Sequence, residues 1–200
     1  FETAKRSFPE ARLGDEIEVE ENPFDSFGRI AAQTAKQVII QKIKEAEKNI
    51  IFTEFKGKEG DLVSGYLQRK SKDAMFIDLG RTEGVMPAKE QSPLEHYKIG
   101  DRIKAILLSV QRDSKGPRVV LSRAHSSFVK KLFEMEIPEV YDGIVNIVNI
   151  VRYPGMRTKV AVSSDREDID SVGACVGMKG VRIQSIVREL EGEKVDVVEY

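Results

Sequence analysis

Four residues near the end of the chain, GMKG at 177–180, have the types and spacing that suit phosphate binding. Two glycines stand three apart with a lysine between them, at the joint of two apolar runs of helical pattern. Glycines lack a Cβ atom and let a sugar-phosphate backbone come within contact distance. Free amides and the dipole at the start of the second helix favour an anion there. The pattern predicts a backbone clamp made of Gly177, Met178, Lys179 and Gly180, with Lys179 as its cation.

Other uses of this stretch fit less well or stay open. A nucleotide-binding P-loop needs a lysine followed by Ser or Thr, and a preceding strand, and GMKGVR has neither. A purely structural helical hairpin remains an alternative. Cys175 is interpreted as a small buried residue, because neither histidine is near it in sequence. As the single cysteine, it also excludes a thiolate zinc site, so we expect no metal, no cofactor and no catalytic residue.

The elements around GMKG must position it, and they follow a defined order. The run HSSFVKKLFEMEIPEV is amphipathic and should end at Pro138. Two strand patterns joined at Pro154-Gly155 come next, and then helix, GMKG, helix and the strand pattern KVDVVEY. The order α-β-β-α-GxxG-α-β resembles the prokaryotic-type (type II) KH domain. Such domains use the loop to clamp about four nucleotides of single-stranded backbone.

Five more cations of this segment are candidates for supporting RNA contacts. Arg182 and Arg188 fall on the second helix, where they would support phosphates. Arg152, Arg157 and Lys159 fall on the two strands and are secondary candidates, because each fits a solvated edge equally well.

The middle of the chain changes to short β-rich runs separated by turn residues. Five strand patterns in about 60 residues predict a small closed barrel. In AMFIDLG, alternation puts Met75 and Ile77 on one face and Phe76 on the other, beside a carboxylate. An outward aromatic invites base stacking, but packing under a loop or against the next domain is an equal alternative.

The same segment resembles the S1 domain, an oligonucleotide-binding (OB-type) barrel. The resemblance rests on GDLVSGYLQR, AMFIDLGRTEGVMP, YKIGDRIKAILLSVQRD and RVVLSR. S1 domains that bind RNA well present a second aromatic and a histidine where this chain has Asp73 and Pro87. Phe76, with Tyr66 as a second candidate, would be the stacking platform, so we expect the barrel to bind RNA weakly.

The first segment predicts a strand at DEIEVEEN and then a long helix at FGRIAAQTAKQVIIQKIKEAEKN. Asp25 or Ser26 could cap that helix, and FKGKEGD supplies a joint after it. A strand and one helix cannot bury a core by themselves. We therefore expect the end of a domain whose front is missing, a reading to which the start at Phe1 also points.

Composition bounds the possible classes of protein. With 40% hydrophobic residues in 200, the chain can bury real cores, yet no apolar run approaches the roughly 18–20 residues of a membrane span. No secretory leader is visible, and a single cysteine fits a reducing cytoplasm. Residues 61–123 carry 12 Lys and Arg against 8 Asp and Glu, and they are the only basic third. A local basic surface suits a polyanion, although such an excess is also ordinary.

The whole chain resembles the NusA family of bacterial transcription elongation, termination and antitermination factors. The resemblance rests on FGRIAAQTAKQVI, LSRAHSSFVKKLFEMEIPEV, VRYPGMRTKVAV and the closing stretch around GMKG. It implies an α+β multidomain chain: residues 1–58 from a domain that docks on RNA polymerase, 59–123 an S1 domain, and 124–200 a first KH domain. It also implies a second KH domain beyond Tyr200.

The expected function is non-catalytic binding of nascent single-stranded RNA at RNA polymerase, which modulates pausing, termination and antitermination. Expected partners are that RNA, the polymerase and other antitermination factors, with a monomeric protein and no membrane contact. The alternative is an S1-KH cap or accessory subunit of an RNA-degrading complex, in which FGRIAAQTAKQVI has no known place. An interaction scaffold with vestigial RNA folds is a third reading.

Overall fold

The computed structural model describes residues 24–113, 116–166 and 168–200, with the side chains of 24–27 and 29 excepted. The strand expected at residues 15–22 lies outside the described residues. The chain divides into two compact units, Phe1–Glu45 and Ala46–Tyr200. Of the described helices, none is long and apolar enough to cross a bilayer.

Helix α2 extends over Phe24–Lys56 and is longer than predicted at both ends. No glycine or proline interrupts the sequence from residue 29 to residue 56, and Gly57 follows the last turn. The expectation that Asp25 or Ser26 caps the helix was wrong, because both lie inside it. The last turns belong to the second unit and bury Phe55 in the core of the barrel, where it is 5% exposed.

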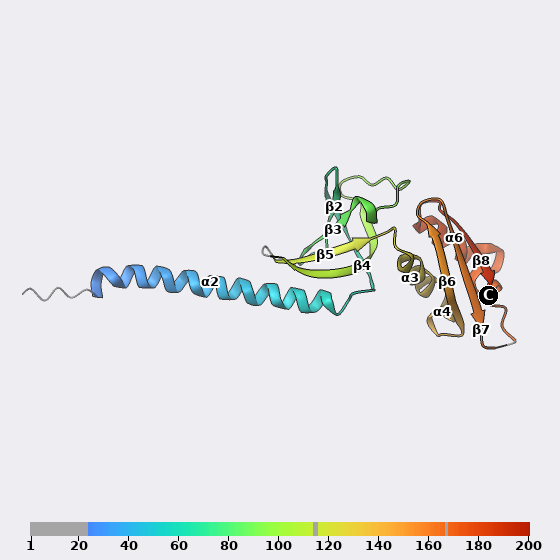
Figure 1. Ribbon diagram of the computed structural model, residues 1–200, viewed down its shortest axis with the longest axis horizontal. Helices are drawn as coiled ribbons and strands as arrows, with labels where there is room; N and C mark the ends of the chain where they lie inside the picture. The colour runs from blue at the N-terminus through green and yellow to red at the C-terminus, as the bar shows by residue number, and fades with distance from the viewer. Residues whose placement is uncertain (1–23, 114–115, 167) are drawn as a thin grey trace, which may run out of the picture. The chain divides into compact units, whose positions relative to one another are not determined.

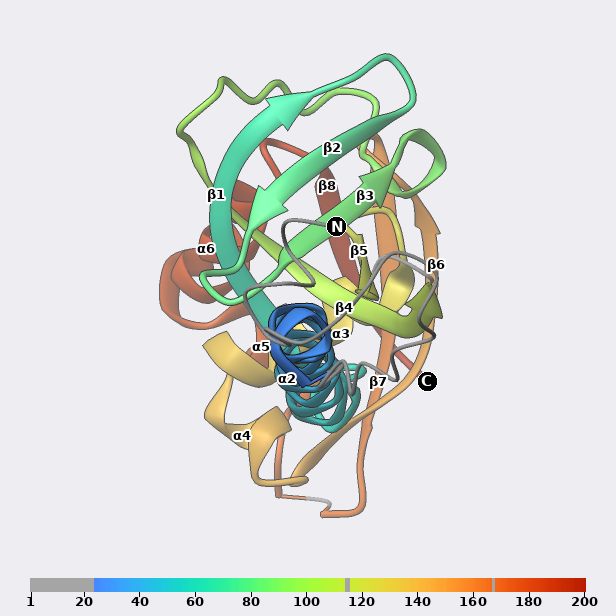
Figure 2. The same ribbon diagram turned by 90° about the vertical axis from the view of Figure 1, so that its left-hand side faces the viewer.

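Five strands form the predicted barrel, in the order β1-β2-β3-β5-β4 (Figure 2). Neighbouring strands are antiparallel except β3 and β5, whose parallel pairing completes the closure. The strands and the short helix that follows β3 are β1 (Leu62–Lys70), β2 (Ala74–Asp78), β3 (Glu83–Pro87), η1 (Ala88–Glu90), β4 (Arg102–Asp113) and β5 (Gly116–Ser122).

Alternation along the strands decides which side chains fill the barrel. Met75 and Ile77 are 3% and 1% exposed and belong to its core, as the sequence predicts. Phe76 lies between them on the outer face and is half-buried. The barrel therefore presents an aromatic to its surroundings at the predicted position.

The remaining elements form a three-stranded sheet with helices packed on one face (Figure 1). The sheet order is β6-β7-β8, with β6 antiparallel and β8 parallel to β7. Pro138 ends the first helix as expected but also begins a second, short one as its first residue. The elements are α3 (Ser126–Glu136), α4 (Pro138–Tyr141), β6 (Val145–Tyr153), β7 (Arg157–Ser164), α5 (Ser171–Val176), η2 (Met178–Gly180), α6 (Val181–Glu189) and β8 (Lys194–Glu199).

One core joins the helices to the sheet and reaches the barrel. Phe128 and Leu132 of α3, Val160 of β7 and Ile186 of α6 are fully buried together. Ile106 of strand β4 belongs to the same cluster, so apolar contact continues across the junction between barrel and sheet domain. This packing fixes the two ends of α6: its first turn at GMKG and its last turn at the barrel.

Candidate nucleic-acid interface

The predicted clamp is a tight turn between two helices. Helix α5 ends at Val176, and Gly177 follows with φ 74° and ψ 171°. The amide of Gly177 donates to Gly173 O at 2.8 Å, and that of Gly180 donates to Gly177 O at 3.0 Å. Helix α6 then begins at Val181. These bonds hold the loop in one conformation while its central side chains stay outside: Met178 is 90% exposed.

The two glycines are required for different reasons. A Cβ on Gly177 would lie 2.8 Å from Cγ of Arg182, which is closer than real Cβ contacts. A Cβ on Gly180 would have no neighbour nearer than 3.8 Å, so only its positive φ of 76° favours glycine there. The sequence argument explained both by the approach of a ligand. The structure adds a reason internal to the protein for each.

Lys179 is exposed and holds a left-handed conformation with φ 54°, which is uncommon outside glycine. Strained residues of this kind concentrate at ligand-binding loops. Helix α6 has no side-chain cap at its first turn, since its N-cap is Gly180. The Val181 amide donates to Met178 O, so what the start of α6 offers an external anion is the positive end of its dipole, beside the Lys179 cation.

Of the two supporting arginines on α6, Arg182 can reach a ligand only by breaking the hydrogen bonds that it forms in the structure. Arg188 lies exposed in the last turn. Arg182 is committed: its Nη1 donates to Ala174 O at 2.7 Å and to Glu139 Oε2 at 2.8 Å. Arg182 was expected to support phosphates, but it lies beneath the loop against Gly177.

Arg152 is a correction to the predicted site. Its side chain is 2% exposed and forms a salt bridge at 2.9 Å with Glu193, which is 0% exposed. It also donates to the carbonyl oxygens of Arg123 and His125. Every one of these contacts is internal to the protein. Arg152 therefore joins elements of the fold, and its guanidinium is not free to contact RNA.

Arg157 and Lys159 are exposed but are not brought to the loop. On β7 they alternate with Thr158 and Val160, which are buried on the face that the helices cover. Both cations therefore project from the opposite, open face of the sheet. Arg157 also pairs with Asp196 of β8 at 2.5 Å, and this guanidinium lowers the pKa of the Asp196 carboxyl.

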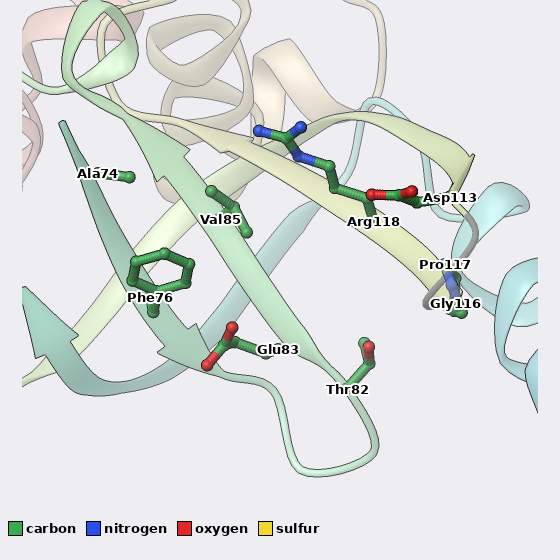
Figure 3. Close-up of a pocket in the computed structure, with 9 residues that line it drawn as sticks. All are labelled: Ala74, Phe76, Thr82, Glu83, Val85, Asp113, Gly116, Pro117 and Arg118. Atoms are coloured by element: carbon green, nitrogen blue, oxygen red, sulfur yellow. The ribbon is translucent and has the colours of Figure 1, made fainter. Parts of the chain in front are cut away.

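The barrel carries a second candidate surface around Phe76. A shallow pocket of about 390 Å³ is lined by Phe76 of β2, Val85 and Glu83 of β3, and Arg118 of β5, among others (Figure 3). The guanidinium of Arg69 stacks over the Phe76 ring, 3.8 Å from its centroid, and pairs with Glu83 at 2.9 Å. One side of the ring is thus occupied by Arg69, and the ring also lines the pocket.

Tyr66 lies apart from that pocket. It is 59% exposed on β1, and its backbone pairs with Asp78 on one side and Arg102 on the other. An exposed ring beside a cation suits a base or a sugar-phosphate backbone. Its partner Asp78 comes two positions after Phe76 on β2, so the register places both predicted aromatics on the outer face of the barrel.

Sequence reasoning missed the buried ionic cluster at the junction. Arg123, 1% exposed, binds Glu95 through two nitrogens at 2.6 and 2.9 Å. The same guanidinium donates to Lys104 O and to both Oε1 and O of Glu189, at the end of α6. A charged residue directly after the buried strand β5 was the only sequence signal for it.

The described residues contain no group of three or more His, Cys, Asp or Glu that could hold a metal ion. Burial raises the pKa of the Cys175 thiol to about 11, which keeps it protonated and unreactive at neutral pH. What the geometry assembles is a fixed cationic turn on an uncapped helix, and a barrel with outward aromatics.

Comparison with known families matches three consecutive stretches. Residues 1–49 match the NusA N-terminal domain, residues 56–123 the S1 RNA binding domain, and residues 123–200 the NusA-like first KH domain. Together these matches cover both predicted RNA-binding folds in the predicted order.

Three relatives named transcription termination/antitermination protein NusA align with nearly the whole chain. Identity is 46% over 200 residues in Bacillus subtilis, 44% over 191 in Thermus thermophilus and 46% over 187 in Borreliella burgdorferi. These alignments cover 100%, 95% and 94% of this chain, but 54%, 49% and 39% of the relatives. The chain thus spans about half the length of the curated relatives it matches. With three family domains in order and this level of identity, the chain belongs to the NusA family.

Proposed function

We propose that this chain is a non-catalytic, RNA-binding part of a transcription factor. It holds nascent single-stranded RNA near RNA polymerase and thereby modulates pausing, termination and antitermination. The observation that carries the proposal is the rigid GMKG turn, which presents an exposed cation at the uncapped start of α6. The relatives are named transcription termination/antitermination proteins, which supports transcription as the process in which this RNA is bound.

Binding at the loop is electrostatic and independent of base identity. A phosphate lies at the positive end of the α6 dipole and takes the charge of Lys179, while Arg188, in the last turn of α6, supports another phosphate. The exposed Met178 side chain lies against the sugar or base. Because each contact displaces counterions, affinity falls as salt rises, with a slope near −0.7 per phosphate for single strands.

The barrel adds a weaker contact. A base stacks on the Phe76 ring in the pocket, near Arg69 and Arg118. Tyr66 offers a separate ring for another nucleotide. Arg157 and Lys159, on the open sheet face, contribute only to the long-range attraction of RNA.

The partners and the cellular compartment that we propose are those of the NusA family. The first residues belong to the part that docks on the polymerase, and other antitermination factors are further partners. The chain acts as a monomer in the cytoplasm, without a cofactor and without contact to a membrane.

The structure provides a matched pair of variants to test the clamp. Gly180→Asp and Gly180→Asn have the same shape, and both residue types tolerate the left-handed conformation. There is room for either Cβ, with no atom nearer than 3.8 Å. Fluorescence anisotropy would follow a labelled, unstructured RNA of about twelve nucleotides, three times the roughly four that a KH loop clamps.

We expect Gly180→Asp to weaken binding by about tenfold or more, since a carboxylate lies where a phosphate must bind, and Gly180→Asn to retain most of the affinity. Equal binding by both variants would indicate that the RNA site lies on the barrel and not at the clamp. If the unaltered chain binds no RNA, the remaining interpretation is an interaction scaffold whose RNA-binding folds are vestigial.

A further inference from the structure

Arg182 links three helices under the clamp. It is the second residue of α6, and its Nη1 donates to the carbonyl of Ala174 in α5 and to the carboxylate of Glu139 in α4. The side chain of Arg182 is 34% exposed and that of Glu139 is 31% exposed. Among the described residues, this is the ion pair that connects α6 to α4.

The aliphatic part of Arg182 lies directly against the first glycine of the loop. Its Cγ, Cδ and Cβ would be 2.8, 3.0 and 3.2 Å from a Cβ placed on Gly177. The guanidinium cannot retreat easily, because both of its acceptors fix it. The stem of Arg182 therefore limits where the Gly177 backbone can lie.

The same side chain also completes the end of α5. The Ala174 carbonyl is one of the last of that helix, where acceptors lack an intrahelical partner and a cation is favourable. Ending α5 at this point allows Gly177 to take ψ 171° and turn the chain into Met178–Gly180.

We infer that Arg182 and Glu139 are positioning residues of the clamp: Glu139 holds Arg182, and Arg182 holds Gly177, without either one contacting the RNA. The inference rests on the proposed function of the loop and deepens it. It gives Glu139, an acid, a role in the binding of a polyanion. It also removes Arg182 from the set of cations that contact phosphate.

Glu139 gives the sharper test, because simple electrostatics predicts the opposite result. Glu139→Ala removes a negative charge near an RNA site, which alone should tighten binding. If Glu139 positions the clamp, affinity falls instead, by about fivefold to tenfold, because the bond is partly exposed and acts on the RNA only through Arg182. Asp142→Ala is the matched control: it removes one exposed acid just past the end of α4 and should leave binding equal or slightly tighter.

The salt dependence separates a phosphate ligand from a positioning residue. Arg188→Ala should lower the slope of log affinity against log salt by about 0.7, the value of one single-strand phosphate contact. Arg182→Ala should weaken binding by a similar factor with the slope unchanged. Exchange of the pair, Arg182→Glu with Glu139→Arg, should restore part of the affinity lost in either single variant.

Loop conformation without RNA is an independent readout. In two-dimensional 15N NMR spectra, the Gly177 and Gly180 amides should shift in Glu139→Ala and stay in place in Asp142→Ala. Tighter binding by Glu139→Ala, or a reduced salt slope in Arg182→Ala, would overturn the inference. If the unaltered chain binds no RNA, the proposed function fails, while unmoved glycine amides in Glu139→Ala would refute the positioning role separately.

Discussion

At the scale of single residues, Lys179 combines a local strain with a functional charge. Within the clamp, Lys179 is the residue that adopts the left-handed conformation although it is not a glycine. Such a conformation costs a non-glycine residue about 1 kcal/mol. A glycine would adopt this conformation without that cost.

Lys179→Gly should therefore change stability and binding in opposite directions. We expect the free energy of unfolding to rise by up to about 1 kcal/mol, as the strain is relieved. RNA affinity should fall by several-fold, and the salt slope by about 0.7, as one cation is lost. Chemical denaturation and anisotropy on the same samples would measure both; a fall in both quantities would show that Lys179 is unstrained.

At the scale of elements, Glu193 joins three pieces of the KH domain. From the loop before β8 it accepts bonds from Arg152 of β6, from the hydroxyl of Thr158 of β7, and from the Gly155 amide of the β6–β7 turn. Burial acts to raise the pKa of this carboxyl, but these donors and the Arg152 charge outweigh burial and lower it below its ordinary 4.5.

Because the folded-state pKa of Glu193 is lowered, its stabilisation is present above pH 4.5 and is lost as pH falls through the folded-state value. Glu193→Gln should reduce stability near pH 7 by about 3 kcal/mol, since Arg152 is left buried without a counter-charge. The difference from the unaltered chain should shrink in acid. Asp196→Asn removes an exposed pair and should change little at any pH.

Urea unfolding between pH 7 and pH 3 would test this. A pH-independent gap between Glu193→Gln and the unaltered chain would show that the carboxylate is not the stabilising species.

The helices and strands were predictable from sequence, but the partners of the charged side chains were not. Short β-rich runs separated by turn residues predicted all five barrel strands, alternation placed Phe76 outside, and the glycine pair predicted the turn between two helices. Arg152 and Arg182, in contrast, meet carboxylates 41 and 43 residues away. A local pattern carries no record of such a partner, so exposed and buried arginines look the same in sequence. The turn geometry that makes Gly177 depend on Arg182 is equally non-local.

At the scale of the whole described molecule, the barrel and the KH domain share one buried charge cluster. Arg123 follows β5 of the barrel and holds Glu95 from the β3–β4 connection together with the end of α6. It also lies 4.7 Å from the Phe128 ring centroid of α3. A desolvated cation with so many partners couples the two folds energetically.

We expect barrel and KH domain to unfold in one calorimetric transition. Arg123→Ala leaves Glu95 buried without its partner and should cost about 3–5 kcal/mol. The single transition should then separate into two. The double variant Arg123→Met with Glu95→Leu removes both charges and should recover most of the stability. One transition in Arg123→Ala would show that apolar contacts such as those of Ile106 suffice for the coupling.

Helix α6 begins at the clamp and ends in this cluster. Its nine residues form a link of about 13 Å between the RNA-binding turn and the guanidinium of Arg123. In mechanical terms, a strand held under tension at the proposed clamp would pull on α6, and the Arg123 cluster is the point at which that force would enter the barrel.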